Sequence, residues 1–115
     1  MNIKSHTNKT EQIIQNAVKY INSNYSDLNV SLESVSDYLN ISVSYLSMLF
    51  SKNQKISFNK YLVKVRMEKA KELLKFTKDK VINISRLVGY NEVYYFSHSF
   101  KKYTGVSPKE FRANV

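Results

Sequence analysis

The chain of 115 residues has no cysteine, one proline, two glycines and two histidines. Without cysteine it can form neither disulfides nor thiolate metal sites, and two histidines leave little for a catalytic or metal site built on imidazole. It also shows no paired carboxylates, no nucleophile beside a base and no glycine-rich phosphate loop. The scarcity of glycine and proline favours helices, because strands and their turns need more such residues. We therefore expect an all-α protein that is not an enzyme and takes no cofactor or metal.

Long hydrophobic runs are also missing, although apolar residues make up 43% of the chain. The longest such runs are a few residues, too short to span a membrane. Residues 1–10 lack the apolar stretch of a signal peptide, so we expect a cytoplasmic protein with no membrane partner.

Acidic residues are few in the second half, and the net charge of +9 is concentrated there. Residues 1–50 hold three Lys or Arg against four Asp or Glu, whereas residues 51–115 hold fifteen against five. Surface lysine often serves only solubility. Helices that alternate lysine with Phe and Tyr, however, are typical of proteins that contact nucleic-acid phosphates.

What the chain does contain is an internal repeat. Residues 35–57, VSDYLNISVSYLSMLFSKNQKIS, resemble residues 84–107, ISRLVGYNEVYYFSHSFKKYTGVS, with a shift of one residue after the first third. In each copy a short helix is followed by a tight turn and a second helix. Asn40 and Gly89 stand where a left-handed residue must end the first helix, and Ile41 and Tyr90 follow as apolar plugs. The pattern predicts two helix-turn-helix units.

Apolar periodicity and capping residues place the helices. They are expected at residues 11–24, 32–39, 42–52, 58–76, 81–88 and 92–103, with a short one after Ser107. The expected N-caps are Thr10, Ser31, Ser42, Ser57, Asn91 and Ser107, the last in a capping box with Glu110. The predicted organisation is a flexible tail (1–10), a first helix-turn-helix subdomain (11–57), a linker helix (58–76) and a second subdomain (77–115).

The second helix of each unit has an inner and an outer face. Leu46 and Phe50, like Phe96 and Phe100, recur at i and i+4 and are expected to pack inward. Exposed Met and Tyr on the other side are hard to explain by packing, whereas thymine methyls and base edges in a DNA major groove would suit them. The predicted base-contacting residues are Val43, Ser44, Ser47, Met48, Val93, Tyr94, Ser97 and His98. A surface for a partner protein is the alternative for these faces.

The helix at residues 58–76 lies between the two units. At about 1.5 Å per residue it is about 28 Å long, and successive major grooves on one face of DNA lie about 34 Å apart. It could therefore set two recognition helices, at about 42–52 and 92–103, in adjacent major grooves. Phosphate contacts are expected from Lys52, Lys55, Lys60, Arg66, Lys101, Lys102, Lys109 and Arg112.

The segments SYLSMLFSK, RMEKAKELL and VGYNEVYYFSHSFKKYTGVSPKEFR make the chain resemble the DNA-binding domain of the AraC/XylS-type transcriptional regulators over about residues 11–113. The resemblance implies two helix-turn-helix subdomains joined by a long helix, binding to double-stranded promoter DNA, and most often activation by recruiting RNA polymerase. The family's base-contacting positions fall on Ser44, Ser47, Met48, Val93, Tyr94, Ser97 and His98. Family members usually carry a second domain for sensing, dimerisation or phosphorylation, so a sensing or receiver domain is expected if the chain is part of a longer protein.

Three departures from the family pattern carry predictions. Ser36 and Ser85 replace a usual alanine and fit if their hydroxyls bond to the preceding turn. Lys55 replaces a usual glycine, so the first loop is expected to differ if the left-handed conformation is too strained. Met48 and His98 stand where arginine is common, and arginine is the most frequent specific partner of guanine. An A/T-rich site is therefore expected, and the unlike outer faces predict two unlike half-sites rather than a palindrome.

Two other classes of function stay open from the residues alone. A helical protein-interaction module would use the same exposed faces, and the many tyrosines would also suit RNA or a single strand. Competition between duplex and single-stranded nucleic acid separates these readings.

Overall fold

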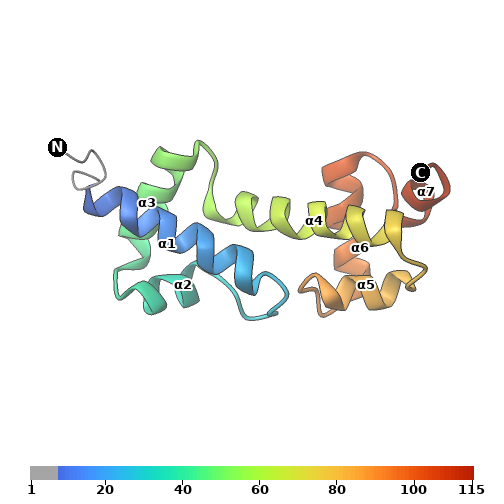
Figure 1. Cartoon of the computed structure of the whole chain (residues 1–115), viewed down its shortest axis with the longest axis horizontal. Coiled ribbons are helices and arrows are strands. Elements are labelled where there is room, and N and C mark those ends of the chain that lie inside the picture. Colours follow the sequence, from blue (N-terminus) through green and yellow to red (C-terminus); the bar gives the residue numbers. More distant parts are fainter. Residues whose placement is uncertain (1–7) are drawn as a thin grey trace. The chain divides into compact units, whose positions relative to one another are not determined.

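The computed structural model describes residues 8–115, and these form seven α-helices and no strand, as the sequence predicts (Figure 1). The helices are α1 (Lys9–Asn24), α2 (Leu32–Leu39), α3 (Val43–Gln54), α4 (Phe58–Phe76), α5 (Val81–Leu87), α6 (Val93–Thr104) and α7 (Pro108–Ala113).

The chain forms two compact units. The first contains the described residues up to Asn24 and Asn29–Tyr61, and the second contains Tyr25–Leu28 and Leu62–Val115. Only the first turn of α4 thus belongs to the first unit, whereas the sequence treats residues 58–76 as a separate linker. The second unit also takes in the loop between α1 and α2.

In the first unit, α1 packs against α2 and α3. Its buried side chains come from every helix of the unit: Ile14, Ala17, Ile21, Val35, Leu46, Leu49, Phe50 and Phe58. The ring of Phe50 lies edge-on to Phe58 and to Tyr61, with centroids 5.4 Å away in both cases, a favoured geometry for aromatic pairs. These contacts hold α3 by its inner face.

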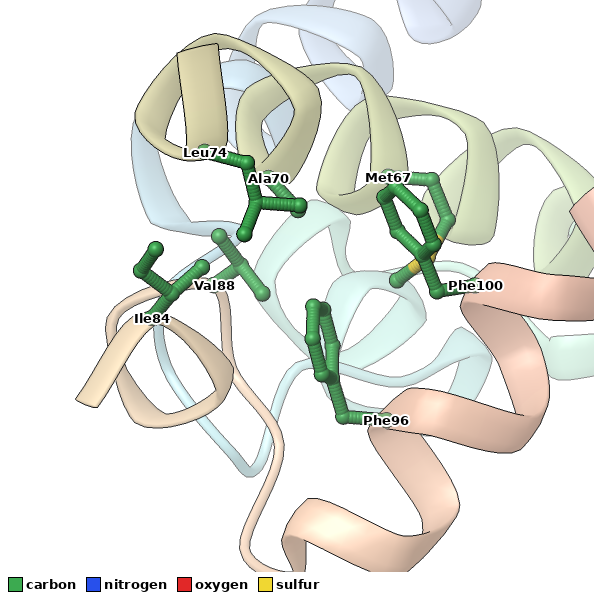
Figure 2. Close-up of a cluster of buried hydrophobic side chains, with 7 residues drawn as sticks. All are labelled: Met67, Ala70, Leu74, Ile84, Val88, Phe96 and Phe100. Atoms are coloured by element: carbon green, nitrogen blue, oxygen red, sulfur yellow. The ribbon is translucent and has the colours of Figure 1, made fainter. Parts of the chain in front are cut away.

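The second unit has a core of its own, drawn in Figure 2. Side chains from α4, the α5 segment and α6 meet there: Met67, Ala70, Leu74, Ile84, Val88, Phe96 and Phe100. Phe96 and Phe100 lie one helical turn apart on α6 with centroids 5.8 Å apart, and Phe100 also contacts Phe111 edge-on at 5.5 Å. The inner face predicted for α6 is therefore confirmed.

Most predicted helix starts are confirmed. The hydroxyls of Ser31, Ser42, Ser57 and Ser107 each accept a hydrogen bond from the amide three residues on. Ser107 and Glu110 form the predicted capping box, and the hydrogen bonds from Ser107 lower the pKa of that carboxyl.

Two predicted starts are wrong. Helix α1 begins at Lys9 rather than Glu11, because Asn8 accepts from the Glu11 amide through its side-chain oxygen at 2.8 Å. Thr10 is therefore inside the helix, and the rest of the predicted tail, residues 1–7, lies outside the described residues. Helix α6 begins after Glu92, not after Asn91, and its first turn has no side-chain cap.

Candidate nucleic-acid interface

The two turns that precede α3 and α6 have the same hydrogen bonds. The amide of Asn40 donates to Asp37 and that of Ile41 to Ser36, and likewise Gly89 donates to Arg86 and Tyr90 to Ser85. Both Asn40 and Gly89 have positive φ, at 58° and 95°. This is the Schellman pattern, in which a left-handed residue ends a helix and directs the chain away. The prediction from the turn residues is thus confirmed in both copies.

The serines that replace alanine lie beneath these turns. Ser36 and Ser85 are both 1% exposed, and their hydroxyls donate to the carbonyls of Glu33 and Ile82 at 2.9 Å. The predicted bond to the preceding turn satisfies each buried hydroxyl.

The helices that follow the turns, α3 and α6, have the same length and start at matching positions of the repeat. Both α3 and α6 have twelve residues, and each residue of α6 is numbered 50 above its counterpart in α3. The turn before α6 is one residue longer because Asn91 stands between the apolar plug Tyr90 and the N-cap Glu92. Both helices end at a left-handed residue, Lys55 with φ 65° and Gly105 with φ 91°. The expectation of a different first loop is therefore wrong, because Lys55 adopts the conformation of a glycine.

The outer faces of α3 and α6 carry the predicted base-contacting residues. Met48 is 56% exposed and Tyr94 is 72% exposed, and the ring of Tyr94 lies edge-on to that of Tyr95 with centroids 5.6 Å apart. Val43, Ser44 and His98 are exposed, and Ser47, Val93 and Ser97 are half-buried. Positions 43, 44, 47 and 48, like 93, 94, 97 and 98, fall in the first half of their helices. That half is the part of a recognition helix that reaches base edges in helix-turn-helix proteins.

Six of the eight residues predicted to contact phosphate are exposed lysines. They lie at the C-terminal ends of the recognition helices and in the first turns of the helices that follow: Lys52, Lys55, Lys60, Lys101, Lys102 and Lys109. The two arginines in that prediction are placed differently.

Arg66 is 9% exposed, and its guanidinium is engaged inside the second unit. Its Nε donates to the carbonyl of Tyr25 and its Nη2 to that of Asp27, both at 2.9 Å, while its Cζ lies 5.7 Å from the ring centre of Tyr90. Burial lowers the pKa of this side chain. The phosphate assignment of Arg66 is withdrawn, because the guanidinium holds the loop before α2 to the turn before α6. Its position four residues after buried Leu62 and four before buried Ala70 is the signal that predicts an inward side chain.

Arg112 is half-buried and also binds backbone carbonyls. Its Nε, Nη1 and Nη2 donate to the carbonyls of Leu74, Asp79 and Thr77 at 3.1, 2.6 and 3.3 Å. These carbonyls lie at the C-terminal end of α4 and just beyond it, where cationic groups stabilise a helix. The phosphate assignment of Arg112 is withdrawn for this reason.

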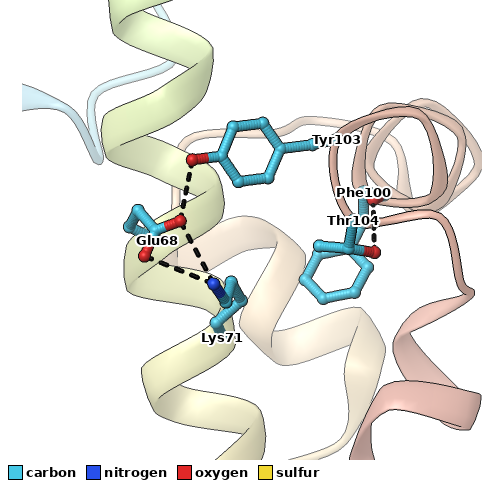
Figure 3. A network of polar contacts seen from close by, with 5 residues as sticks. All are labelled: Glu68, Lys71, Phe100, Tyr103 and Thr104. Carbon is cyan, nitrogen blue, oxygen red and sulfur yellow. Dashed lines mark hydrogen bonds and ion pairs between the residues drawn. The ribbon is translucent and has the colours of Figure 1, made fainter.

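One contact of the second unit was not expected from the sequence (Figure 3). Tyr103 on α6 donates to Glu68 on α4 at 2.7 Å, and Lys71 approaches the same carboxylate at 3.3 Å. Tyr103 and Glu68 are 35 positions apart, so no local sequence pattern predicts the hydrogen bond between them.

Within residues 8–115, no group of His, Asp or Glu could hold a metal ion. No helix in that range has the length and apolarity needed to cross a membrane.

Two helix-turn-helix units, each with an exposed second helix flanked by lysines, define a DNA-binding class of protein. The helix-turn-helix domain family matches residues 35–114. The chain belongs to the AraC/XylS-type transcriptional regulators and corresponds to their DNA-binding domain.

Similar proteins and solved structures agree with this family assignment. The chain is 39% identical to the raffinose operon transcriptional regulatory protein RafR of Pediococcus pentosaceus and 40% identical to the lactose operon transcription activator of Staphylococcus xylosus. Each match covers 86% of this chain and 35% of the relative, so the chain spans about a third of their length. The C-terminal domain of AraT, a response regulator from Geobacillus stearothermophilus, is 41% identical and superimposes with a TM-score of 0.91, over 94% of this chain and 89% of that one.

Proposed function

We propose that this chain regulates transcription by inserting α3 and α6 into adjacent major grooves of double-stranded promoter DNA. The observation that supports this most directly is the exposed outer face of each helix, where Met48 is 56% exposed and Tyr94 is 72% exposed. Water does not favour such side chains, whereas a major groove offers thymine methyls and base edges to them.

The proposed contacts to bases come from four matched pairs of positions. They are Val43 with Val93, Ser44 with Tyr94, Ser47 with Ser97, and Met48 with His98. Neither α3 nor α6 contains arginine, which is the usual partner of guanine. The target is therefore proposed to be rich in A and T, and to be recognised by methyl contacts and by the shape of the duplex.

Phosphate contacts are proposed for the six exposed lysines alone: Lys52, Lys55, Lys60, Lys101, Lys102 and Lys109. The second unit has Lys101 and Lys102 in the last turn of α6 itself, and α3 has only Lys52 in its last turn. The second unit is thus proposed to supply the larger part of the affinity.

An activating role through contact with RNA polymerase is part of the proposal. It is supported by relatives such as the lactose operon transcription activator, whose name states this role for that protein. Because the chain spans about a third of the length of those relatives, a sensing or receiver domain is proposed as well if the chain is part of a longer protein. A cytoplasmic location is also proposed, since promoter DNA is the proposed target.

Selection of bound duplexes from a random pool tests the proposal, with a matched single-stranded pool as competitor. We expect enrichment of duplexes with an A/T-rich consensus. Retention of single strands instead would favour the alternative of a single-strand or RNA binder, and enrichment of neither would favour a protein-interaction module. A guanine-rich duplex consensus would contradict the proposed mode of base contact.

A further inference from the structure

The outer face of each recognition helix consists of two adjacent rows of side chains. Residues four apart on a helix lie one above the other, so they form a row along its surface. We define the first row as positions 43 and 47 of α3 with positions 93 and 97 of α6. The second row is defined as positions 44 and 48 with positions 94 and 98.

The first row is the same in the two helices and the second row is different. Val43 and Ser47 in α3 correspond to Val93 and Ser97 in α6. In the second row, Ser44 and Met48 correspond to Tyr94 and His98, which differ in size and in hydrogen-bonding groups. The two faces are therefore half alike, although the sequence comparison treats them as unlike.

Equal residues contact equal bases only if each helix is held in the same way within its own unit. Leu46 and Phe50 on the inner face of α3 are fully buried, and so are their counterparts Phe96 and Phe100 on the inner face of α6. Because these anchors occupy the same helical positions, the two outer rows face away from the core by the same rotation of the helix.

The elements at both ends of the helices match as well. The extra residue Asn91 precedes the N-cap, so it lengthens the turn without changing the register of α6. Lys52 and Lys102 occupy the same exposed position ten residues into their helices. Ser57 and Ser107 then cap the next helix in both units, after the left-handed residues Lys55 and Gly105. Contacts to phosphate set the orientation of a DNA-binding helix, and Lys52 and Lys102 are available for them at the same place in both units. Lys101 has no such counterpart, since Ser51 stands at the matching position of α3.

We propose that the DNA target contains a partial internal repeat. The element bound by α3 and the element bound by α6 share the bases that face Val43/Val93 and Ser47/Ser97. They differ at the bases that face Ser44/Tyr94 and Met48/His98. This inference rests on the proposed insertion of both helices and adds the internal structure of the site they bind.

The repeat gives the second row a definite role, which is to distinguish one element from the other. Ser44 and Met48 select the element for α3, whereas Tyr94 and His98 select the element for α6. A chain whose second rows were equal would bind two equal elements and could not distinguish them by base contacts.

The test is selection of duplexes by the whole chain and by the double variant Ser44→Tyr/Met48→His, in which α3 has the second row of α6. Both substituted positions are exposed, so the variant is expected to fold, and circular dichroism verifies this. The wild type should enrich a consensus in which one short element occurs twice with differences, and the double variant should enrich one in which the two elements are alike. Changing a shared base pair in either element should weaken binding of both proteins by about tenfold.

The reciprocal variant Tyr94→Ser/His98→Met provides a second measurement, in which the elements should become alike in the other direction. A duplex consensus without any shared element, or elements that stay unlike in both variants, would overturn the inference and leave the proposed function standing. A wild type that enriches no duplex would overturn the proposed function itself.

Discussion

The phenol of Tyr103 donates a 2.7 Å hydrogen bond to the carboxylate of Glu68 and so connects the last turn of α6 to the middle of α4. Partial burial and this bond raise the pKa of Tyr103 to about 12. The bond from Tyr103, followed by that from Lys71, lowers the pKa of Glu68. The pair therefore holds the recognition helix of the second unit to α4 while Tyr103 is protonated and Glu68 is ionised.

Replacing Tyr103 with Phe should lower the free energy of unfolding at pH 7 by about 0.5–1 kcal/mol, because the bond is largely exposed to water. The folded state raises the pKa of Tyr103, so its contribution is complete below the ordinary tyrosine value near 10 and is lost as the pH rises through about 12. The folded state lowers the pKa of Glu68, so that contribution is lost as the pH falls through the lowered value. Urea unfolding at a series of pH values measures the difference between wild type and variant.

Tyr95→Phe is the matched control, since Tyr95 lies on the same helix and is 63% exposed. It should leave stability unchanged across the same range. A Tyr103→Phe difference that persists at pH 12.5 would show that the hydroxyl is not the source of the effect.

The two glycines should respond differently to alanine. A Cβ on Gly89 would lie 2.4 Å from the carbonyl oxygen of Tyr25 and 2.7 Å from Nε of Arg66, whereas a Cβ on Gly105 would meet nothing within 4 Å. Both substitutions strain a left-handed backbone, which costs about 1–2 kcal/mol. Gly89→Ala should additionally disturb the Arg66 hydrogen bonds, for a total of about 3 kcal/mol. Thermal unfolding of the two variants compares them, and equal losses would contradict the close approach at Gly89.

Replacing Lys55 with glycine should stabilise the protein. The φ of Lys55, 65°, is a conformation that glycine adopts without strain, so Lys55→Gly should raise the free energy of unfolding by about 1 kcal/mol. Lys55→Ala keeps the strain and should leave stability nearly unchanged. Both variants should reduce the salt slope of DNA binding by about one unit if the ammonium contacts phosphate. Chemical unfolding and binding titrations separate the effect of the backbone from that of the charge.

Lys101 and Lys102 should account for two phosphate contacts. Changing both to Ala should flatten the plot of log affinity against log salt by about two units, since each contact releases about one counterion. The double variant Lys78→Ala/Lys80→Ala makes the same change in net charge in the loop between α4 and α5 and should leave the slope unchanged. Equal slopes for the two double variants would mean that net charge rather than contact determines the salt dependence.

Arg112 and Lys109 should show opposite effects. Arg112→Ala removes three bonds to the end of α4 and should cost about 2 kcal/mol of stability while leaving the salt slope unchanged. Lys109→Ala should leave stability unchanged and reduce the slope by about one unit. Calorimetry and binding titrations on both variants test this, and a slope that falls for Arg112→Ala would restore its phosphate role.

Features set by neighbouring residues could be predicted from the sequence. Helix α4 begins and ends where expected, because Ser57 caps it and the apolar pattern continues to Phe76. The left-handed residues Asn40 and Gly89 were found for the same reason, since turn chemistry depends on a few adjacent positions.

Roles that depend on residues far apart in the chain could not be predicted. Arg66 and Arg112 look like phosphate ligands in a basic protein, but their carbonyl partners lie 33 to 41 positions away. The inner and outer faces of α3 and α6 could be predicted, because the apolar periodicity of a helix indicates which side is buried. The match between the first rows of α3 and α6 follows from the one-residue shift in the repeat, and the observed helix starts place the extra residue Asn91 before the N-cap of α6.

The second unit is discontinuous in the sequence, since Tyr25–Leu28 belong to it and the residues on either side do not. No single cut of the chain can therefore release that unit whole. A fragment starting at Leu62 would lack the two carbonyls that Arg66 binds, and its guanidinium would lose the acceptors that satisfy it. A fragment ending at Tyr61 would keep the loop but lose the arginine. Studies of one unit at a time thus require a covalent link between Tyr25–Leu28 and α4 rather than truncation.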